Sequence, residues 1–234
     1  MLRLIFHWHA FLEIKSDDFS IFVDPFISGN PQVDIDLAQA QKLDNLKYIV
    51  LTHGHSDHLG DTVDLAKSNN WILTIATFEL AQYLQNIEWV KNIHAMHIWG
   101  GADFGDFWLK YTPAIHGWGI GDLNSWYTTL AWWVLFEIEG KYIYHAGDTA
   151  LTQDMKLLED YRIDVAFLPI WDNFTMGIDD AVKAVEFIKP KMVVPIHYNT
   201  WPIISADEGE FARKVMLAGI AKPKVLRPGD EIVL

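Results

Sequence analysis

An apolar segment over residues 48–51 leads directly into six residues that hold three histidines and an aspartate. The segment is rich in β-branched and aromatic side chains, and its length predicts a buried strand. The motif that follows is His53-Gly54-His55-Ser56-Asp57-His58. Imidazole and carboxylate groups are common protein ligands of zinc, manganese and iron. The sequence therefore predicts a metal site where a buried strand ends.

The spacing within this motif favours two metal positions over one. Alternate side chains diverge in an extended or turning segment, so His53 and His55 are predicted to point one way and Asp57 and His58 another. Ten histidines in 234 residues make one or two in a loop ordinary. Three within six residues, beside an aspartate, indicate metal binding rather than chance composition.

Three further candidate ligands stand where apolar segments are predicted to end. They are His116 after residues 109–115, Asp148 after residues 142–147, and His197 after residues 192–196. Gly117 and Gly147 would let the backbone turn beside two of them. Taken singly, each is ordinary as a surface histidine or a turn residue. With the first motif they make seven ligands in four loops, which suits two metals bridged by one carboxylate.

Composition excludes several classes of function. The net charge of −13 is poorly suited to binding nucleic acid or an anionic membrane surface. The chain has no cysteine, which excludes disulfides, thiolate metal sites and a thiol nucleophile. It shows no signal peptide and no apolar run of the ~18 residues that a membrane span needs. We expect a soluble, cytoplasmic protein that acts on a small molecule, and a homo-oligomer is compatible with this composition.

The order of predicted elements describes two similar halves in one domain, residues 1–234. The first half has strands at 2–8, 11–15, 19–23, 48–51 and 72–76, helices at 36–43, 61–69 and 78–84, and strands at 93–98 and 107–111. The second has a hairpin of 130–138 and 141–144 across Glu139-Gly140, helices at 149–159, 178–188 and 206–218, and strands at 164–168, 192–196, 225 and 232–233. Mixed strands alternating with helices predict two sheets packed face to face with helices outside.

The order of the candidate ligands resembles the metallo-β-lactamase superfamily. Segments 22–26, 51–58, 144–149, 172–177 and 194–200 carry this resemblance across nearly the whole chain. Within the superfamily, the chain is similar to small metal-dependent hydrolases related to L-ascorbate-6-phosphate lactonase. The resemblance implies an α/β (α+β) fold, the αββα four-layer sandwich, with metals at one edge between the sheets.

The resemblance also implies roles for individual residues. It places His53, His55 and His116 on the first metal, Asp57, His58 and His197 on the second, and Asp148 between them. It further gives Asp57 the role of proton acceptor or water orienter.

Two bound cations about 3.5–4 Å apart lower the pKa of a shared water towards ~7 and supply a bridging hydroxide as the nucleophile. We therefore expect hydrolysis of an ester, lactone, amide or phosphoester, with two divalent cations as cofactors. Zinc is the first choice, and manganese or iron are alternatives. The competing hypothesis is a non-catalytic metal- or ligand-binding protein on the same fold, since fold does not fix function.

Five other residues near these motifs are candidates for contacts behind the metals or with substrate. Asp24 is either a turn residue or a carboxylate that accepts the second ring N–H of a ligating histidine. The resemblance places His9 near the metal edge. Trp118 and Trp171 either line an apolar pocket or pack the loops down. Asn199 either contacts substrate or caps the next helix.

Overall fold

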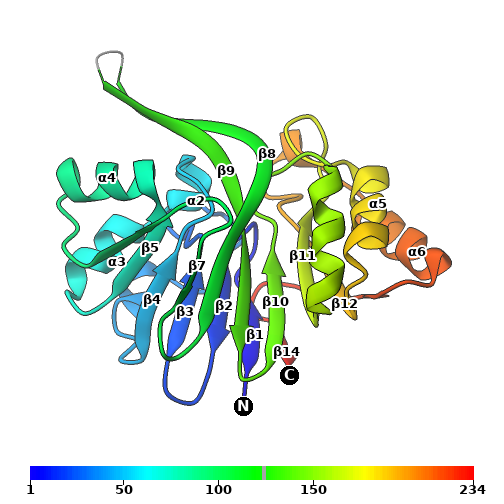
Figure 1. The fold of residues 1–234 in the computed structure, drawn as a ribbon, viewed down its shortest axis with the longest axis horizontal. Coiled ribbons are helices and arrows are strands. Elements are labelled where there is room, and N and C mark those ends of the chain that lie inside the picture. Colours follow the sequence, from blue (N-terminus) through cyan, green and yellow to red (C-terminus); the bar gives the residue numbers. More distant parts are fainter. Residues whose placement is uncertain (123–124) are drawn as a thin grey trace. The chain divides into compact units, whose positions relative to one another are not determined.

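We analysed a computed structural model that describes residues 1–122 and 125–234. Its strands form two seven-stranded sheets, in the orders β14-β1-β2-β3-β4-β5-β6 and β13-β12-β11-β10-β9-β8-β7 (Figure 1). The chain divides into two compact units. The first unit contains residues 1–98, 117–130 and 227–234, and the second contains residues 99–116 and 131–226.

The sheet of the first unit is antiparallel at one side and parallel at the other. Its strands are β1 (Arg3–Phe6), β2 (Leu12–Lys15), β3 (Ser20–Val23), β4 (Leu46–Val50), β5 (Leu73–Thr77), β6 (Ile93–Met96) and β14 (Glu231–Val233). Its helices are α1 (Leu37–Ala40), α2 (Ser56–Leu59), α3 (Thr62–Ser68) and α4 (Phe78–Asn86). β3, β4, β5 and β6 pair in parallel. Parallel strands end at the same edge, so Asp24 after β3 and the histidine motif after β4 lie at one edge.

The second unit repeats this plan. Its strands are β7 (Gly101–Asp103), β8 (Trp108–Asp122), β9 (Ser125–Ile138), β10 (Lys141–His145), β11 (Val165–Pro169), β12 (Met192–Ile196) and β13 (Lys222–Pro223), with β8 and β9 continuing into residues 117–130 of the first unit. Its helices are α5 (Ile178–Ile188), α6 (Glu208–Ala218) and the 3-10 helices η1 (Gln153–Tyr161) and η2 (Pro202–Ile204). β10, β11 and β12 pair in parallel. Asp148, the loop 170–177 and His197 therefore follow strands that end at one edge.

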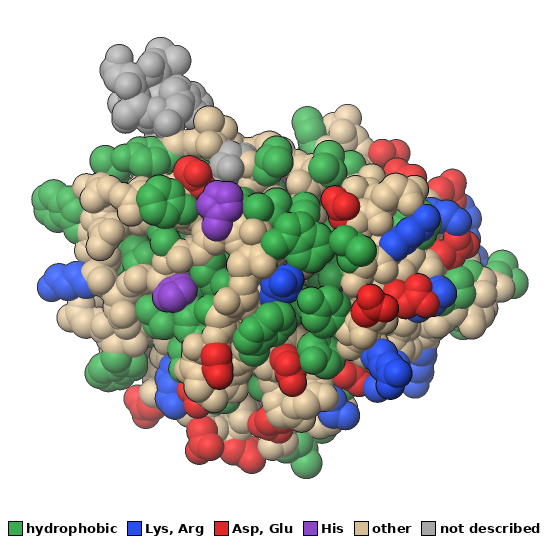
Figure 2. Space-filling view, in the orientation of Figure 1, with side chains coloured by type: hydrophobic (Ala, Val, Ile, Leu, Met, Phe, Trp, Pro, Cys, Tyr) green, Lys and Arg blue, Asp and Glu red, His purple; other side chains and the backbone are tan. Residues whose placement is uncertain are grey.

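Helices α5 and α6 bring paired charges to the surface of the second unit. Lys214 lies 2.6 Å from Asp179 and 2.7 Å from Glu210, which makes an ion pair with each carboxylate. Acidic and basic side chains gather on this part of the molecule (Figure 2). No helix among the described residues is long and apolar enough to span a bilayer.

Several elements agree closely with the expectations from sequence. The predicted helix at 178–188 and the strand at 192–196 have those bounds. The hairpin turns at Glu139 and Gly140, whose positive φ values of 51° and 71° suit a two-residue turn. The expected α/β elements form two mixed sheets with accompanying helices. The single-domain organisation stays a prediction.

Three expectations were wrong. The short strand expected at 225 is β13 (Lys222–Pro223) instead, because the chain pairs with β12 at these two residues. The helix expected over 149–159 is the 3-10 helix η1, which buries Met155 and Leu158, three residues apart, the period of a 3-10 turn. His116 does not stand at a strand end, because β8 continues through it to Asp122. β9 lies beside β8 in the sheet, so the long hairpin keeps the backbone extended where a loop was expected. The short helix α2, within the histidine motif, and strand β7 were not predicted.

Candidate metal centre

A fully buried carboxylate, Asp24, organises the histidine motif of the first unit. It follows β3 with a positive φ of 48°. Its side chain accepts the backbone N–H of Thr52 at 2.8 Å and the Thr52 hydroxyl at 2.6 Å. It also accepts a hydrogen bond from Nδ1 of His58 at 2.7 Å. One carboxylate thus fixes the start of the motif and one of its candidate ligands.

These contacts determine which ring nitrogens face a metal. The Thr52 hydroxyl gives its one hydrogen to Asp24, so it accepts a hydrogen bond from Nδ1 of His53, 3.0 Å away. His53 and His58 therefore both carry a proton on Nδ1, which makes Nε2 the metal-binding atom of each ring. Ligand atoms of Asp24, His53 and His58 lie within 4.8 Å of one another.

His53 and His55 point to a common position, as the alternation of their side chains predicts. Nε2 of His53 lies 3.0 Å from Nδ1 of His55. Two nitrogens that share a tetrahedral zinc at ~2.0–2.1 Å are roughly 3.3 Å apart. The two imidazoles therefore fit one divalent cation.

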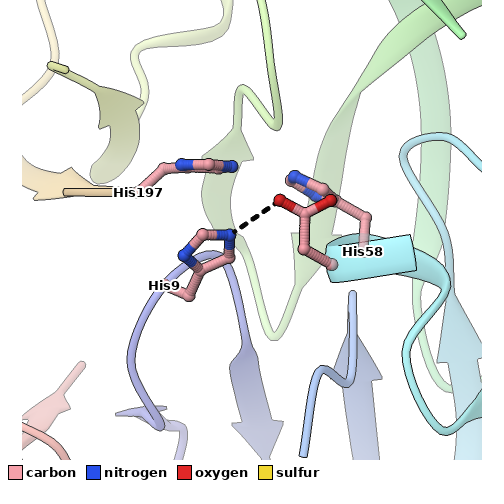
Figure 3. A group of neighbouring side chains, drawn as sticks. His9, His58 and His197 are labelled. Atoms are coloured by element: carbon pink, nitrogen blue, oxygen red, sulfur yellow. Dashed lines mark hydrogen bonds and ion pairs between the residues drawn. The ribbon is translucent and has the colours of Figure 1, made fainter. Parts of the chain in front are cut away.

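His9 holds Asp57. The imidazole is fully buried in the turn after β1, where Trp8 and His9 have φ values of 88° and 63°. Positive φ is unfavourable for residues other than glycine, and such backbone strain concentrates at functional sites. Nε2 of His9 lies 3.2 Å from Oδ2 of Asp57 (Figure 3). This contact fixes the direction of the Asp57 carboxylate.

Trp118 packs directly on the histidine motif. Its side chain is only 3% exposed, and its indole N–H donates to the carbonyl of Leu130 at 3.2 Å. A Cβ added at Gly54 would lie 2.4 Å from the Trp118 ring. Of the two interpretations from sequence, the structure favours packing over the lining of an open pocket.

Changing Gly54 to alanine should therefore lower stability by about 1–3 kcal/mol, because the new methyl group would overlap the indole. Thermal unfolding of the metal-free protein measures this loss. Gly117→Ala is the matched control, since a Cβ there meets nothing within 4 Å. Trp118→Leu should restore stability to the Gly54→Ala chain. An unchanged melting temperature in Gly54→Ala would contradict this packing.

In the second unit, Asp148 lies between two histidines. Its Oδ2 is 3.7 Å from Nε2 of His116, and its Oδ1 is 3.3 Å from Nε2 of His197. The three side chains are 5%, 10% and 2% exposed, respectively. Each carboxylate oxygen thus faces a different imidazole, which is the arrangement that a carboxylate bridging two cations requires.

The loop after β11 orients His116. Asp172 and Asn173 have φ values of 66° and 59°, and this turn presents the carbonyl of Phe174 to His116. Because a carbonyl only accepts, Nδ1 of His116 donates to it at 3.2 Å, and Nε2 is the metal-binding atom. Sequence patterns did not indicate this contact, because it involves a backbone atom.

Two buried residues beside Asp148 support the same loops. Thr149 accepts the N–H of Ile115 on its hydroxyl and the N–H of Met176 on its carbonyl. His145 accepts the N–H of Gly147 on Nδ1 at 3.2 Å, where Gly147 has a φ of 51°. These contacts hold the backbone on both sides of Asp148.

The remaining candidates have clear places. The Trp171 ring stacks on His197, with centroids 5.5 Å apart and planes 13° apart. The side-chain amide of Asn199 exchanges two hydrogen bonds of 3.0 Å with the backbone of Ala206. Asn199 therefore closes its own loop, and Asp207 is the residue that caps the next α-helix. A contact of Asn199 with substrate stays a prediction.

A second buried ionic network in the first unit is separate from these ligands. His7 contacts Asp34 at 2.7 Å through Nδ1 and Glu13 at 3.3 Å through Nε2. Burial lowers the pKa of His7, but its hydrogen bonds to the two carboxylates outweigh burial and raise the pKa overall. Burial likewise opposes ionisation of Glu13 and Asp34, yet hydrogen bonds, above all to His7, lower the pKa of both.

The donor sets fit divalent cations chemically. The five histidines and two aspartates of the predicted ligand set are nitrogen and oxygen donors that suit zinc, manganese and iron. Asp24, Thr52 and Phe174 orient three of the imidazoles from behind, as partners of metal-binding histidines commonly do. Residues 51–61, 112–120, 146–152 and 197–207, which carry the seven ligands, contain no lysine or arginine to compete for the carboxylates.

Known proteins resemble this chain along its whole length. The family model described as Beta-lactamase superfamily domain matches residues 20–198. A UPF0173 metal-dependent hydrolase from Geobacillus sp. (strain WCH70) is 48% identical over 241 residues, which cover 100% of both chains. Igni18, a metallo hydrolase from Ignicoccus hospitalis, is 30% identical with a TM-score of 0.86, covering 99% of this chain and 97% of its own.

A more distant similarity bears on the fold. The metallo-β-lactamase fold protein YhfI from Bacillus subtilis has a TM-score of 0.77 at 11% identity, covering 99% of this chain and 98% of its own. Together with the two mixed sheets, this confirms the predicted fold class. The narrower relation to L-ascorbate-6-phosphate lactonase stays a prediction.

Proposed function

This chain belongs to the β-lactamase superfamily, among its metal-dependent hydrolases, and from that premise we propose that it uses two divalent cations to hydrolyse an ester, lactone, amide or phosphoester of a small molecule. The net charge of −13 supports a small-molecule substrate over a nucleic acid or a membrane surface. Zinc is the cation that we propose first, with manganese or iron as alternatives.

We assign the ligands as follows. One cation is held by His53, His55 and His116, the other by Asp57, His58 and His197, and Asp148 bridges them. The observation that carries the proposal is the placement of Asp148 in the second unit, with one carboxylate oxygen towards His116 and the other towards His197. The convergence of His53 and His55 in the first unit supports it independently.

When bound, the cations supply Lewis acidity towards the carbonyl or phosphoryl oxygen and make hydroxide available as a shared nucleophile near neutral pH. The protein residues prepare this chemistry. Asp24 keeps protons on Nδ1 of His58 and, through Thr52, of His53, so that both Nε2 atoms are available as ligands. Asp57 accepts the proton of the attacking water, and His9 holds its carboxylate in place.

A non-catalytic metal- or ligand-binding protein is the alternative. It would keep the same ligands and the same metal content, but it would show no metal-dependent turnover of esters, lactones or phosphodiesters. A substrate panel therefore separates the two functions once the metal content is known.

The metal content of the purified protein tests the ligand assignment directly. We expect about two equivalents per chain by elemental analysis, falling to about one or less in His116→Ala. His94→Ala is the control, because His94 is an exposed histidine on β6 and should leave the content unchanged. Protein with almost no metal, which zinc, manganese and iron all fail to restore, would overturn the proposal.

A further inference from the structure

Beside two of the candidate ligands, the second unit carries an aromatic surface that the hydrolytic chemistry itself does not use. It consists of the exposed ring of Phe174 and of Trp171, which is 9% exposed, and we call it the aromatic shelf. The two rings are tilted at 52° with centroids 5.5 Å apart, and the Trp171 ring stacks on His197. The shelf is thus continuous with a candidate metal ligand.

Hydrogen bonds hold the backbone of Phe174, while its side chain lies largely in solvent. It is 61% exposed, one of the more exposed large apolar side chains among the described residues. Its backbone is fixed by the N–H of Phe174 bonding to the carbonyl of Asp172 at 2.7 Å, and its own carbonyl binds His116. An exposed apolar ring, carried by hydrogen-bonded backbone beside candidate metal ligands, is typical of a substrate contact.

The apolar character extends to the strand that carries His116. Ile115, immediately before it, is 51% exposed. Residues 112–120, 146–152, 170–177 and 197–207 contain no lysine or arginine. These segments therefore offer hydrophobic contact but no basic side chain for a phosphate or carboxylate group.

A cavity that Trp171 helps to line carries negative charge. This cavity of about 370 Å³ is lined by Trp171 and by four acidic residues, Asp172, Asp179, Asp180 and Glu210. Lys214, in the lining of this cavity, is already paired with Asp179 and Glu210. This field disfavours an anionic substrate group near the shelf.

We propose that the aromatic shelf binds the apolar chain of an uncharged ester or lactone, so that the substrate of this hydrolase is a neutral hydrophobic molecule and not a sugar phosphate or phosphodiester. The inference rests on the proposed function and narrows its substrate class. Phe174 is a specificity residue here, since its ring would contact the substrate chain while its carbonyl orients His116.

Two measurements test the shelf. The first compares kcat/KM for p-nitrophenyl acetate, butyrate and octanoate with that for bis(p-nitrophenyl) phosphate. The second titrates octanamide and acetamide calorimetrically, which requires no turnover. We expect the octanoate ester to exceed the acetate ester by about tenfold or more, octanamide to bind more tightly than acetamide by a similar factor, and the phosphodiester to be the poorest substrate.

Variants connect these preferences to Phe174. Phe174→Ala should abolish most of the chain-length preference, mainly through KM, because the backbone carbonyl that binds His116 remains. Phe174→Leu should keep most of it, and Phe78→Ala, which removes a 51%-exposed phenylalanine on α4, should change nothing. If the chain-length preference persists in Phe174→Ala, or if the phosphodiester is the best substrate, the proposal that the shelf binds an apolar substrate chain is wrong.

The shelf and the hydrolase proposal fail in different ways. Turnover that depends on metal and on Asp57 but is indifferent to chain length contradicts the shelf and leaves the hydrolase intact. Bound metal without turnover of any panel member contradicts the hydrolase, and octanamide binding then still decides whether the shelf holds an apolar chain.

Discussion

Replacing Asp57 with alanine should reduce kcat/KM for any substrate of this protein by about a thousandfold or more. The side chain serves twice in the proposed mechanism, as a ligand of one cation and as proton acceptor. A positioned general base by itself contributes about 10²–10⁴-fold to a rate. Its loss also leaves His9, a fully buried imidazole, without the carboxylate that it contacts at 3.2 Å.

Steady-state kinetics on metal-loaded protein measure this effect, with metal content determined for the same samples. Asp57→Asn keeps the size of the side chain and removes its basicity, so it separates loss of the proton acceptor from loss of shape. Asp64→Ala removes an exposed aspartate on α3 and should retain full activity. Undiminished turnover in Asp57→Ala would contradict the role of Asp57 as metal ligand and proton acceptor.

Replacing Asp24 with alanine should destabilise the protein on the order of 3–5 kcal/mol. The change leaves three buried donors without their acceptor: the N–H and hydroxyl of Thr52 and Nδ1–H of His58. Each buried donor that loses its partner costs about 1–3 kcal/mol. Metal affinity should also fall about 10–100-fold, because the orientation of His53 and His58 depends on this carboxylate.

Thermal unfolding with and without a chelator separates the two effects. For a chain of this size we expect the melting temperature of the metal-free protein to fall by about 10 °C. Asp24→Asn keeps one acceptor oxygen but turns an amide N–H₂ towards the donors. Its melting temperature should therefore lie between those of the wild type and Asp24→Ala. Asp18→Ala, at an exposed turn, is the control. A metal-free Asp24→Ala protein as stable as the wild type would contradict the hydrogen-bond arrangement described above.

Much of the fold could be predicted because its signals are local. Helix α5 places Ala181, Ala184, Val185 and Ile188 on one buried face and aspartates in its first turn, so pattern and charge agree on its bounds. The extent of β8 could not be predicted in this way. The backbone stays extended through His116 because β8 lies beside β9 in the sheet. The residue types of 112–120 alone do not indicate that a neighbouring strand is present.

The sequence by itself determined the set of candidate ligands and the grouping of all of them except His116 at strand ends. Histidine and aspartate spacing is a property of the chain, and parallel strands joined by helices must end at a common edge. The contacts behind the ligands were decided only by the tertiary structure. The contact of Asp24 with Thr52 and His58 joins residues 28 and 34 positions apart, which meet because β3 pairs with β4. The packing of Trp118 on Gly54 and the hydrogen bond from His116 to the Phe174 carbonyl also join segments that are distant in sequence. The first depends on how side-chain shapes fit and the second on the direction of a backbone carbonyl, and neither can be read from residue types.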